Sequence, residues 1–159
     1  MAWSRDCVSA EDLIRCGEDF ARVLRSGDIV LLSGPLGAGK TTFTKGVASA
    51  LGVVERVTSP TFTMVREHRC SNSQGIERLH HCDVYRVASL DEVLDLALGE
   101  LVEEAGVALV EWGELAASVF GRDVLTLSLS VSDDEVRHLV VGGDAARGRE
   151  DELNVWANQ

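Results

Sequence analysis

One octapeptide, residues 34–41 (GPLGAGKT), constrains the fold of this chain more than any other feature. It has the form G-x-x-x-x-G-K-T, which is typical of loops that bind nucleotide phosphates, and residues 34–41 are called the P-loop below. A short apolar run at 29–32 precedes it. Apolar residues at helical spacing follow it from Thr42 to Leu51, where Gly52 offers a stop. The sequence therefore predicts a buried strand, a glycine loop and a helix, the context in which this motif binds phosphate.

The residue types in the octapeptide suit a phosphate ligand. Glycines let backbone N–H groups turn inward around phosphate oxygens, and the N-terminus of the following helix adds partial positive charge. Lys40 is placed to reach the terminal phosphates, and the hydroxyl of Thr41 is placed to ligate Mg²⁺. We therefore expect the chain to bind a nucleoside triphosphate.

Two acidic residues follow expected strands and are candidates for the same site. Glu111 ends the apolar run 106–111, and such a strand would deliver its carboxylate beside the P-loop. There it could hold Mg²⁺, directly or through water, or orient the attacking water. Asp83 follows a shorter, partly apolar strand and could also reach Mg²⁺ or its water shell. A solvated aspartate at the end of a strand is the alternative interpretation of Asp83.

A hydroxyl-rich connector lies between the P-loop helix and Asp83. Its central residues are Ser59, Pro60, Thr61 and Phe62. In P-loop proteins the segment after the first helix often senses the γ-phosphate and Mg²⁺. These residues are therefore either a nucleotide-sensing switch or a plain turn before a strand.

The acidic balance of the chain restricts its partners. The 159 residues include 26 acidic and 15 basic side chains, which gives a net charge of −11. A surface of this charge repels a phosphate backbone and disfavours extensive direct binding of nucleic acid. No apolar run approaches the roughly 20 residues of a membrane span, and the N-terminus has no signal region. We expect a soluble cytoplasmic protein that makes no contact with a membrane.

A histidine and cysteine cluster could in principle hold zinc. His68-x-Cys70 and His80-His81-Cys82 place these residue types on two neighbouring expected strands. The arginines and the polar loop around them instead indicate an ordinary exposed hairpin, and no zinc is expected. The four cysteines form no C-x-x-C pair and are interpreted as reduced apolar residues.

Hydrophobic periodicity predicts the remaining elements. Helices are expected over 9–24, 89–102 and 115–120. Strands are expected at 62–67, 77–84, 106–111, 124–131 and 136–141, the first two forming a hairpin beside the P-loop strand. The expected fold class is α/β: a single P-loop NTPase-like domain, residues 1–143, with a mixed central sheet that contains antiparallel strands and is flanked by helices. The polar composition of residues 144–159 predicts a mobile C-terminal tail, in which Trp156 could dock locally.

The combination of motifs resembles the bacterial TsaE (YjeE) family from about Ser9 to Gly143. The motifs that carry the resemblance are Gly34–Thr42, Ser59-Pro60-Thr61-Phe62, His81-x-Asp83-x-Tyr85-Arg86 and Glu111-Trp112. The resemblance implies an ATPase needed to make N6-threonylcarbamoyladenosine at position 37 of ANN-decoding tRNAs. It also implies TsaB and TsaD as protein partners, with tRNA reached only through their complex. Such an ATPase is expected to be slow alone and to be stimulated by its partners.

The resemblance also implies roles for individual residues. It makes Lys40, Asp83 and Glu111 the catalytic residues, Thr41 and Glu111 the Mg²⁺ ligands, and Ser59 to Phe62 the switch. The resemblance leaves open which of the two acids holds the metal and which orients water, and Glu111 is favoured for the metal. Phe62 stands where the motif often has tyrosine. The residues implied to bind ATP are Gly34, Gly37, Ala38, Gly39, Lys40, Thr41 and Thr42.

Three other functions are alternatives to this ATPase. A small-molecule kinase usually has an arginine-rich lid, and Arg147 and Arg149 are too sparse to form one. A regulatory GTPase would carry the tetrapeptide N-K-x-D, which does not occur. A nucleotide-binding scaffold that does not hydrolyse ATP keeps the same fold and motifs, and it stays open at the level of sequence.

Overall fold

The structure, a computed structural model, describes residues 2–55, 57, 65–83, 100, 102–111 and 123–159. Its strands are β1 (Trp3–Cys7), β2 (Ile29–Ser33), β3 (Val65–Arg69), β4 (Arg78–Asp83), β5 (Gly106–Glu111), β6 (Leu125–Val131) and β7 (Arg137–Gly142). The helices are α1 (Ala10–Ala21), α2 (Lys40–Ala50), the short 3-10 helix η2 (Asp144–Ala146) and α5 (Glu150–Ala157). The predicted helices over 89–102 and 115–120 lie outside the described residues, apart from Glu100 and Val102.

Within the described residues the strands form one mixed sheet of seven strands in the order β1-β7-β6-β2-β5-β4-β3. β2, which leads into the P-loop, lies between β5 and β6 and runs parallel to both. The first four residues of β2, the run 29–32, are all buried, as expected for a strand covered on both faces. The predicted α/β class and mixed sheet are confirmed.

The β3–β4 hairpin lies in a different place from the predicted one. The two strands do pair antiparallel, from Val65 with Cys82 to Arg69 with Arg78. However, β5 separates them from β2, and β4 runs parallel to β5. The prediction of antiparallel strands directly beside the P-loop strand was therefore wrong. β3 exposes most of its charged residues, and such a strand is tolerated only at the edge of a sheet.

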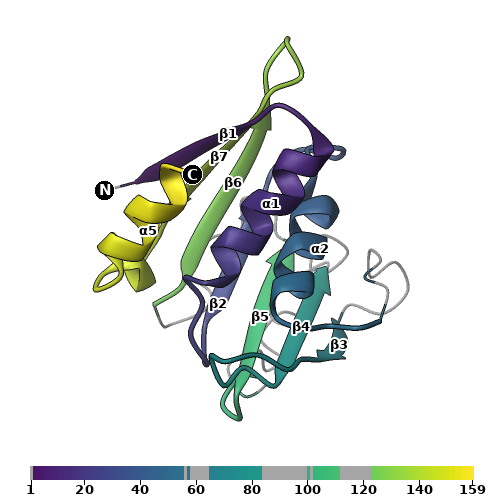
Figure 1. Cartoon of the computed structure of the whole chain (residues 1–159), viewed down its shortest axis with the longest axis vertical. Coiled ribbons are helices and arrows are strands. Elements are labelled where there is room, and N and C mark those ends of the chain that lie inside the picture. The colour runs from purple at the N-terminus through teal and green to yellow at the C-terminus, as the bar shows by residue number, and fades with distance from the viewer. Residues whose placement is uncertain (1, 56, 58–64, 84–99, 101, 112–122) are drawn as a thin grey trace, which may run out of the picture.

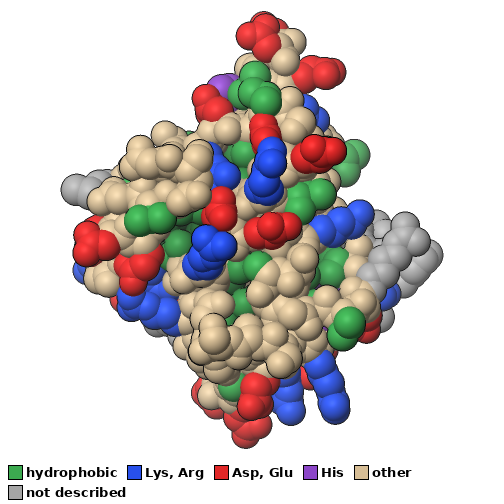
Figure 2. Space-filling view, viewed as in Figure 1, with side chains coloured by type: hydrophobic (Ala, Val, Ile, Leu, Met, Phe, Trp, Pro, Cys, Tyr) green, Lys and Arg blue, Asp and Glu red, His purple; other side chains and the backbone are tan. Residues whose placement is uncertain are grey.

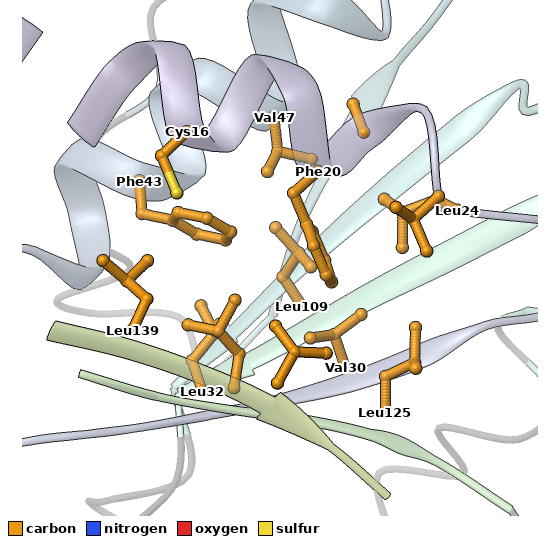
Figure 3. Packing of buried hydrophobic residues seen from close by; sticks show 14 of the residues in the cluster. Cys16, Phe20, Leu24, Val30, Leu32, Phe43, Val47, Leu109, Leu125 and Leu139 are labelled. Atoms are coloured by element: carbon orange, nitrogen blue, oxygen red, sulfur yellow. The ribbon is translucent and has the colours of Figure 1, made fainter. Parts of the chain in front are cut away.

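Two helices cover one face of the sheet next to β2. α1 begins at its cap residue Ser9, whose Oγ accepts a hydrogen bond of 3.1 Å from the backbone N–H of Asp12. Figure 1 shows α1 and α2 side by side over the central strands. Phe20 of α1 and Phe43 of α2 meet with ring centroids 5.5 Å apart. Both rings pack onto sheet residues such as Leu32, as Figure 3 shows, so the core lies between this helix pair and the sheet.

The C-terminal segment is folded, and the prediction of a mobile tail at 144–159 was wrong. Leu153 and Trp156, three residues apart on α5, are 0% and 1% exposed and join the core cluster. The indole N–H of Trp156 donates to the carbonyl oxygen of Cys16 over 3.1 Å. Arg149 makes two hydrogen bonds of 2.7 and 2.9 Å to the buried carboxylate of Asp28. The polar composition of the segment obscured these few anchoring residues.

β1 was not predicted from the sequence. It pairs antiparallel with β7, from Trp3 opposite Val141 to Cys7 opposite Arg137. Only its two end residues are buried, so it lacks the continuous apolar run of a central strand. The indole N–H of Trp3 donates to the side chain of Asn154 over 2.8 Å, which ties this edge strand to α5.

Within the described part of the chain, no helix is long and apolar enough to cross a membrane.

Acidic and basic side chains are mixed over the face that α1 and α2 cover, as Figure 2 shows. One local exception is the turn between β6 and β7, where Asp133, Asp134 and Glu135 are all exposed. Because β6 runs parallel to β2, this acidic turn lies at the same edge of the sheet as the P-loop.

Candidate functional site

The P-loop occupies the turn between the central strand and α2. β2 ends at Ser33 and α2 begins at Lys40, as predicted. Gly39 caps the helix with a φ of 109°, and a Cβ atom at this position would collide with the side chain of Leu13. Gly34 has a φ of 150°, and its Cβ would lie 2.7 Å from the carbonyl oxygen of Leu129. Both conformation and space therefore require glycine at these two positions.

The loop presents backbone amides at the start of α2. The N–H of Ala38 donates to the carbonyl oxygen of Pro35 over 3.1 Å, and the N–H of Phe43 donates to Gly39 over 2.9 Å. The amides of residues 40–42 come before the hydrogen bond from Phe43 to Gly39. The first N–H groups of a helix have no carbonyl acceptor within the helix, so these amides face the loop. With the helix dipole, these amides suit an anion.

Lys40 folds back over the loop. Its ammonium group donates to the carbonyl oxygen of Gly34 over 2.7 Å, so the charge lies at the mouth of the loop. Thr41 and Thr42 follow it in the first turn of α2 and are half-buried. The predicted phosphate-binding residues are thus brought together in one loop and one helical turn.

Glu111 ends β5 next to this loop. Its Cα pairs with that of Leu32 in β2, two residues before Gly34. Paired residues of parallel strands point to the same face, so the Glu111 side chain lies on the face that α2 covers. The residue is only 5% exposed. Its position at the carboxyl edge of the sheet, beside the P-loop, is the one that the sequence predicted.

Asp83 is placed by its backbone alone. It is the last residue of β4, and its Cα pairs with that of Glu111. The two predicted acids therefore end neighbouring strands at the same edge of the sheet. The side chain of Asp83 lies outside the described part of the structure.

The predicted switch, Ser59 to Phe62, also lies outside the described residues, as do Tyr85, Arg86 and Trp112. The described chain resumes at Val65, which pairs with Cys82. β3 thus begins at the sheet edge where Asp83 and Glu111 end their strands.

His81 is a residue of this site to which no role in it was assigned from the sequence, although it belongs to the H-x-D-x-Y-R motif and was considered as a zinc ligand. It is 0% exposed, and its Nε2 lies 3.7 Å from Oε1 of Glu111. Neither ring nitrogen has a hydrogen-bond partner among the described residues. The available signal was its spacing, since His81 lies two residues before Asp83 and hence on the same face of β4.

The donor atoms at this edge fit Mg²⁺. Thr41 offers a hydroxyl and Glu111 a carboxylate, and Mg²⁺ prefers such hard oxygen ligands. Glu111 is a buried carboxylate whose only ion-pair contact within the described residues is the distant His81 nitrogen. A buried carboxylate favours a compensating cation.

The residues weighed as zinc ligands are divided between the two faces of the sheet. His80 pairs with Glu67 of β3, whereas His68 pairs with Leu79, so the two histidines point to opposite faces. His68 is instead engaged by Glu55, with 2.6 Å between its Nδ1 and the carboxylate. All four cysteines are free thiols, and Cys7, Cys16 and Cys82 are buried.

Comparisons with known proteins point to one family. The family model described as threonylcarbamoyl adenosine biosynthesis protein TsaE matches residues 7–139. A tRNA threonylcarbamoyladenosine biosynthesis protein TsaE of Treponema pallidum is 43% identical over 137 residues, covering 85% of this chain and 98% of the relative. The protein of that name from Streptomyces coelicolor is 44% identical over 146 residues, covering 89% and 97%.

A solved structure has the same fold. The crystal structure of YdiB from Bacillus subtilis superposes with a TM-score of 0.74 at 30% sequence identity, covering 98% of this chain and 95% of that one. The sheet and the helices beside it are therefore shared over nearly the whole length of both chains.

Proposed function

The chain belongs to the TsaE family, whose members take part in tRNA threonylcarbamoyladenosine biosynthesis, and from that premise we propose that it is a Mg²⁺-dependent ATPase of this pathway. The observation that carries the proposal is the meeting of a P-loop with a buried carboxylate. Lys40 and Thr41 begin α2, and Glu111 ends the strand beside β2. This is the arrangement that binds and hydrolyses nucleoside triphosphates in P-loop enzymes.

Each residue of the site then has a defined task. The amides of residues 37–42 would hold the phosphates, and the ammonium group of Lys40 would exchange the Gly34 carbonyl for phosphate oxygens. Thr41 and Glu111 would hold Mg²⁺, which offsets the charge that develops on the phosphates. Asp83, at the end of the next strand, would orient the attacking water. Residues 59–62 would sense the γ-phosphate as a switch.

The nucleotide and the partners follow from the family and the charge. ATP is proposed over GTP because the sequence has no N-K-x-D tetrapeptide, which reads guanine in regulatory GTPases. With a net charge of −11, the protein would reach tRNA only through a complex of TsaB and TsaD. ATP binding and hydrolysis would reset that complex between modification cycles, without activating the tRNA directly.

The decisive experiment is reconstitution of the modification with purified TsaB, TsaD and this protein. Phosphate release should be slow for the protein alone and faster when both partners are added. Lys40→Ala should lower phosphate release and modification roughly 100-fold or more, since it removes a charge aimed at the transition state. Lys45→Ala is the matched control, because Lys45 lies one turn further along α2 and is exposed; it should behave like the wild type.

Two outcomes would count against this proposal. Full modification by the Lys40→Ala variant would show that the P-loop is not required. Tight ATP binding without phosphate release in any combination of partners would favour the non-hydrolysing scaffold instead.

A further inference from the structure

The buried histidine next to Glu111 has no evident packing role. His81 lies within β4 between its pairing partners, Leu109 of β5 and Arg66 of β3. It is 0% exposed, and both ring nitrogens lack hydrogen-bond partners among the described residues. A buried polar atom without a partner costs stability, so an apolar side chain of similar size would serve the core better. The imidazole therefore calls for a functional explanation.

The geometry indicates which group the imidazole serves. Asp83 pairs with Glu111 and His81 pairs with Leu109, so His81 is the diagonal neighbour of Glu111 on the same face. The gap of 3.7 Å between His81 Nε2 and Glu111 Oε1 exceeds a hydrogen bond by less than 1 Å. A rotation of the carboxylate closes it, and hydrogen bonds of this kind often tighten only when ligands bind.

We propose that His81 is a positioning residue for Glu111, whose carboxylate it orients by donating a hydrogen bond from Nε2–H. One carboxylate oxygen accepts this bond, and the other is left available to the cation at the P-loop. The inference rests on the proposed function, because it assumes that Glu111 ligates Mg²⁺. It assigns His81 no contact with nucleotide and no proton transfer, and it requires only the neutral imidazole with its proton on Nε2.

Loss of the hydrogen bond should weaken metal binding in a recognisable way. Removal of a residue that hydrogen-bonds to a metal-ligating side chain typically lowers the metal affinity 10- to 100-fold. Without His81, the glutamate side chain must be ordered by the cation alone. Binding of nucleotide without Mg²⁺ should be unaffected, because His81 does not reach the phosphate loop.

Three substitutions of His81 separate a positioning role from a structural one. In His81→Gln the amide nitrogen lies near the place of Nε2, whereas in His81→Asn it reaches only as far as Nδ1. His81→Leu removes both nitrogens and keeps an apolar side chain. Binding of a fluorescent ADP analogue would be titrated with Mg²⁺ and repeated in EDTA, so that the readout does not depend on turnover.

The expected pattern follows the position of the donor atom. The Mg²⁺ midpoint should rise roughly 10- to 100-fold in His81→Asn and His81→Leu, and His81→Gln should stay close to the wild type. Affinity in EDTA should be the same for all four proteins. The melting temperature of His81→Leu should be no lower than that of the wild type, because two buried nitrogens that have no hydrogen-bond partner among the described residues are removed.

A double-mutant cycle tests whether His81 acts through Glu111. In a Glu111→Gln background, His81→Leu should change the Mg²⁺ midpoint no further, because the group that it orients is already lost. Equal and independent effects in both backgrounds would overturn the proposal. So would equal midpoints in His81→Gln and His81→Asn, a comparison that holds even if His81→Leu does not fold.

The design also separates this inference from the proposed function. A wild-type protein that binds the ADP analogue with no response to Mg²⁺ would contradict the proposed metal site itself, and the inference with it. A normal response in the wild type and unchanged midpoints in every variant would overturn the inference alone.

Discussion

The reactivity of each cysteine thiol depends on how deeply that residue is buried. Cys82 is fully buried, and burial raises its pKa to about 12. Cys70 is only half-buried, and burial raises its pKa to about 11. A raised pKa keeps the thiol protonated, whereas it is the thiolate that attacks an alkylating reagent.

Alkylation should therefore rank these two thiols. With iodoacetamide at pH 8 and the native protein, Cys82 should stay unmodified, because at most about 1 in 10,000 of its thiols is ionised. Cys70 should react slowly but first. Peptide mapping by mass spectrometry gives both rates, with the protein unfolded in urea as the reference in which both react. Equal rates for native and unfolded Cys82 would contradict the burial described for β4.

At the level of single residues, part of the site could be predicted from the sequence and part could not. The P-loop residues and Glu111 could be predicted, because each follows a local apolar run that fixes its place at the sheet edge. His81 could not, because its role depends on which strand lies beside β4 and in which register.

The close approach of α1 and α2 depends on two glycines, one in each helix. A Cβ atom on Gly46 would collide with the backbone carbonyl oxygen of Ile14, and one on Gly17 with that of Phe43. These obstacles are backbone atoms, so relief requires the helices to move apart. The P-loop would be displaced as well, because Leu13 of α1 packs against Gly39.

Gly46→Ala should accordingly destabilise the protein by about 1–3 kcal/mol, even though alanine is the better helix former by about 1 kcal/mol. Urea unfolding followed by circular dichroism measures the difference. Ser49→Ala provides the control on the exposed side of the same helix, where propensity acts alone and a gain of a few tenths of a kcal/mol is expected. A Gly46→Ala variant as stable as the wild type would mean that the helices do not touch here.

Helices and strands could be predicted where one or both of their faces are apolar. They could not be predicted where only a few of their residues are buried. The runs that became β5, β6 and β7 were identified almost to the residue. β1 was missed because its interior residues Ser4, Arg5 and Asp6 are polar. It forms a strand because it pairs antiparallel with β7, which the local sequence does not indicate. The β3–β4 hairpin was predicted as a unit, but its position depends on β5, which follows it in the chain.

At the scale of the whole molecule, a buried ion pair joins the C-terminal segment to the P-loop strand. Arg149 and Asp28, which precedes β2, have side chains only 7% and 9% exposed. Arg149 also donates to the carbonyl oxygen of Val23 over 3.0 Å. Removing one member of such a pair leaves a buried charge without a partner, which costs about 3–5 kcal/mol.

Arg149→Met should thus lose about 3–5 kcal/mol of unfolding free energy, a large share of the 5–15 kcal/mol typical of a domain. Arg147→Met is the control, because the Arg147 side chain is 81% exposed and pairs with Asp144 at the surface; little change is expected. The double variant Asp28→Asn/Arg149→Met should recover part of the loss. Equal stability of the two single variants would contradict the packed C-terminal segment.

The pairing of the first strand with the last has a consequence for synthesis. β1 ends at Cys7, and its partner β7 begins at Arg137. Chains grow at roughly 5–20 residues per second, so a nascent β1 waits on the order of ten seconds for its partner. During that interval Trp3 and Cys7, both buried in the finished protein, have no strand to pack on. β1 is therefore made well before β7 but can reach its final place only after β7 has been made.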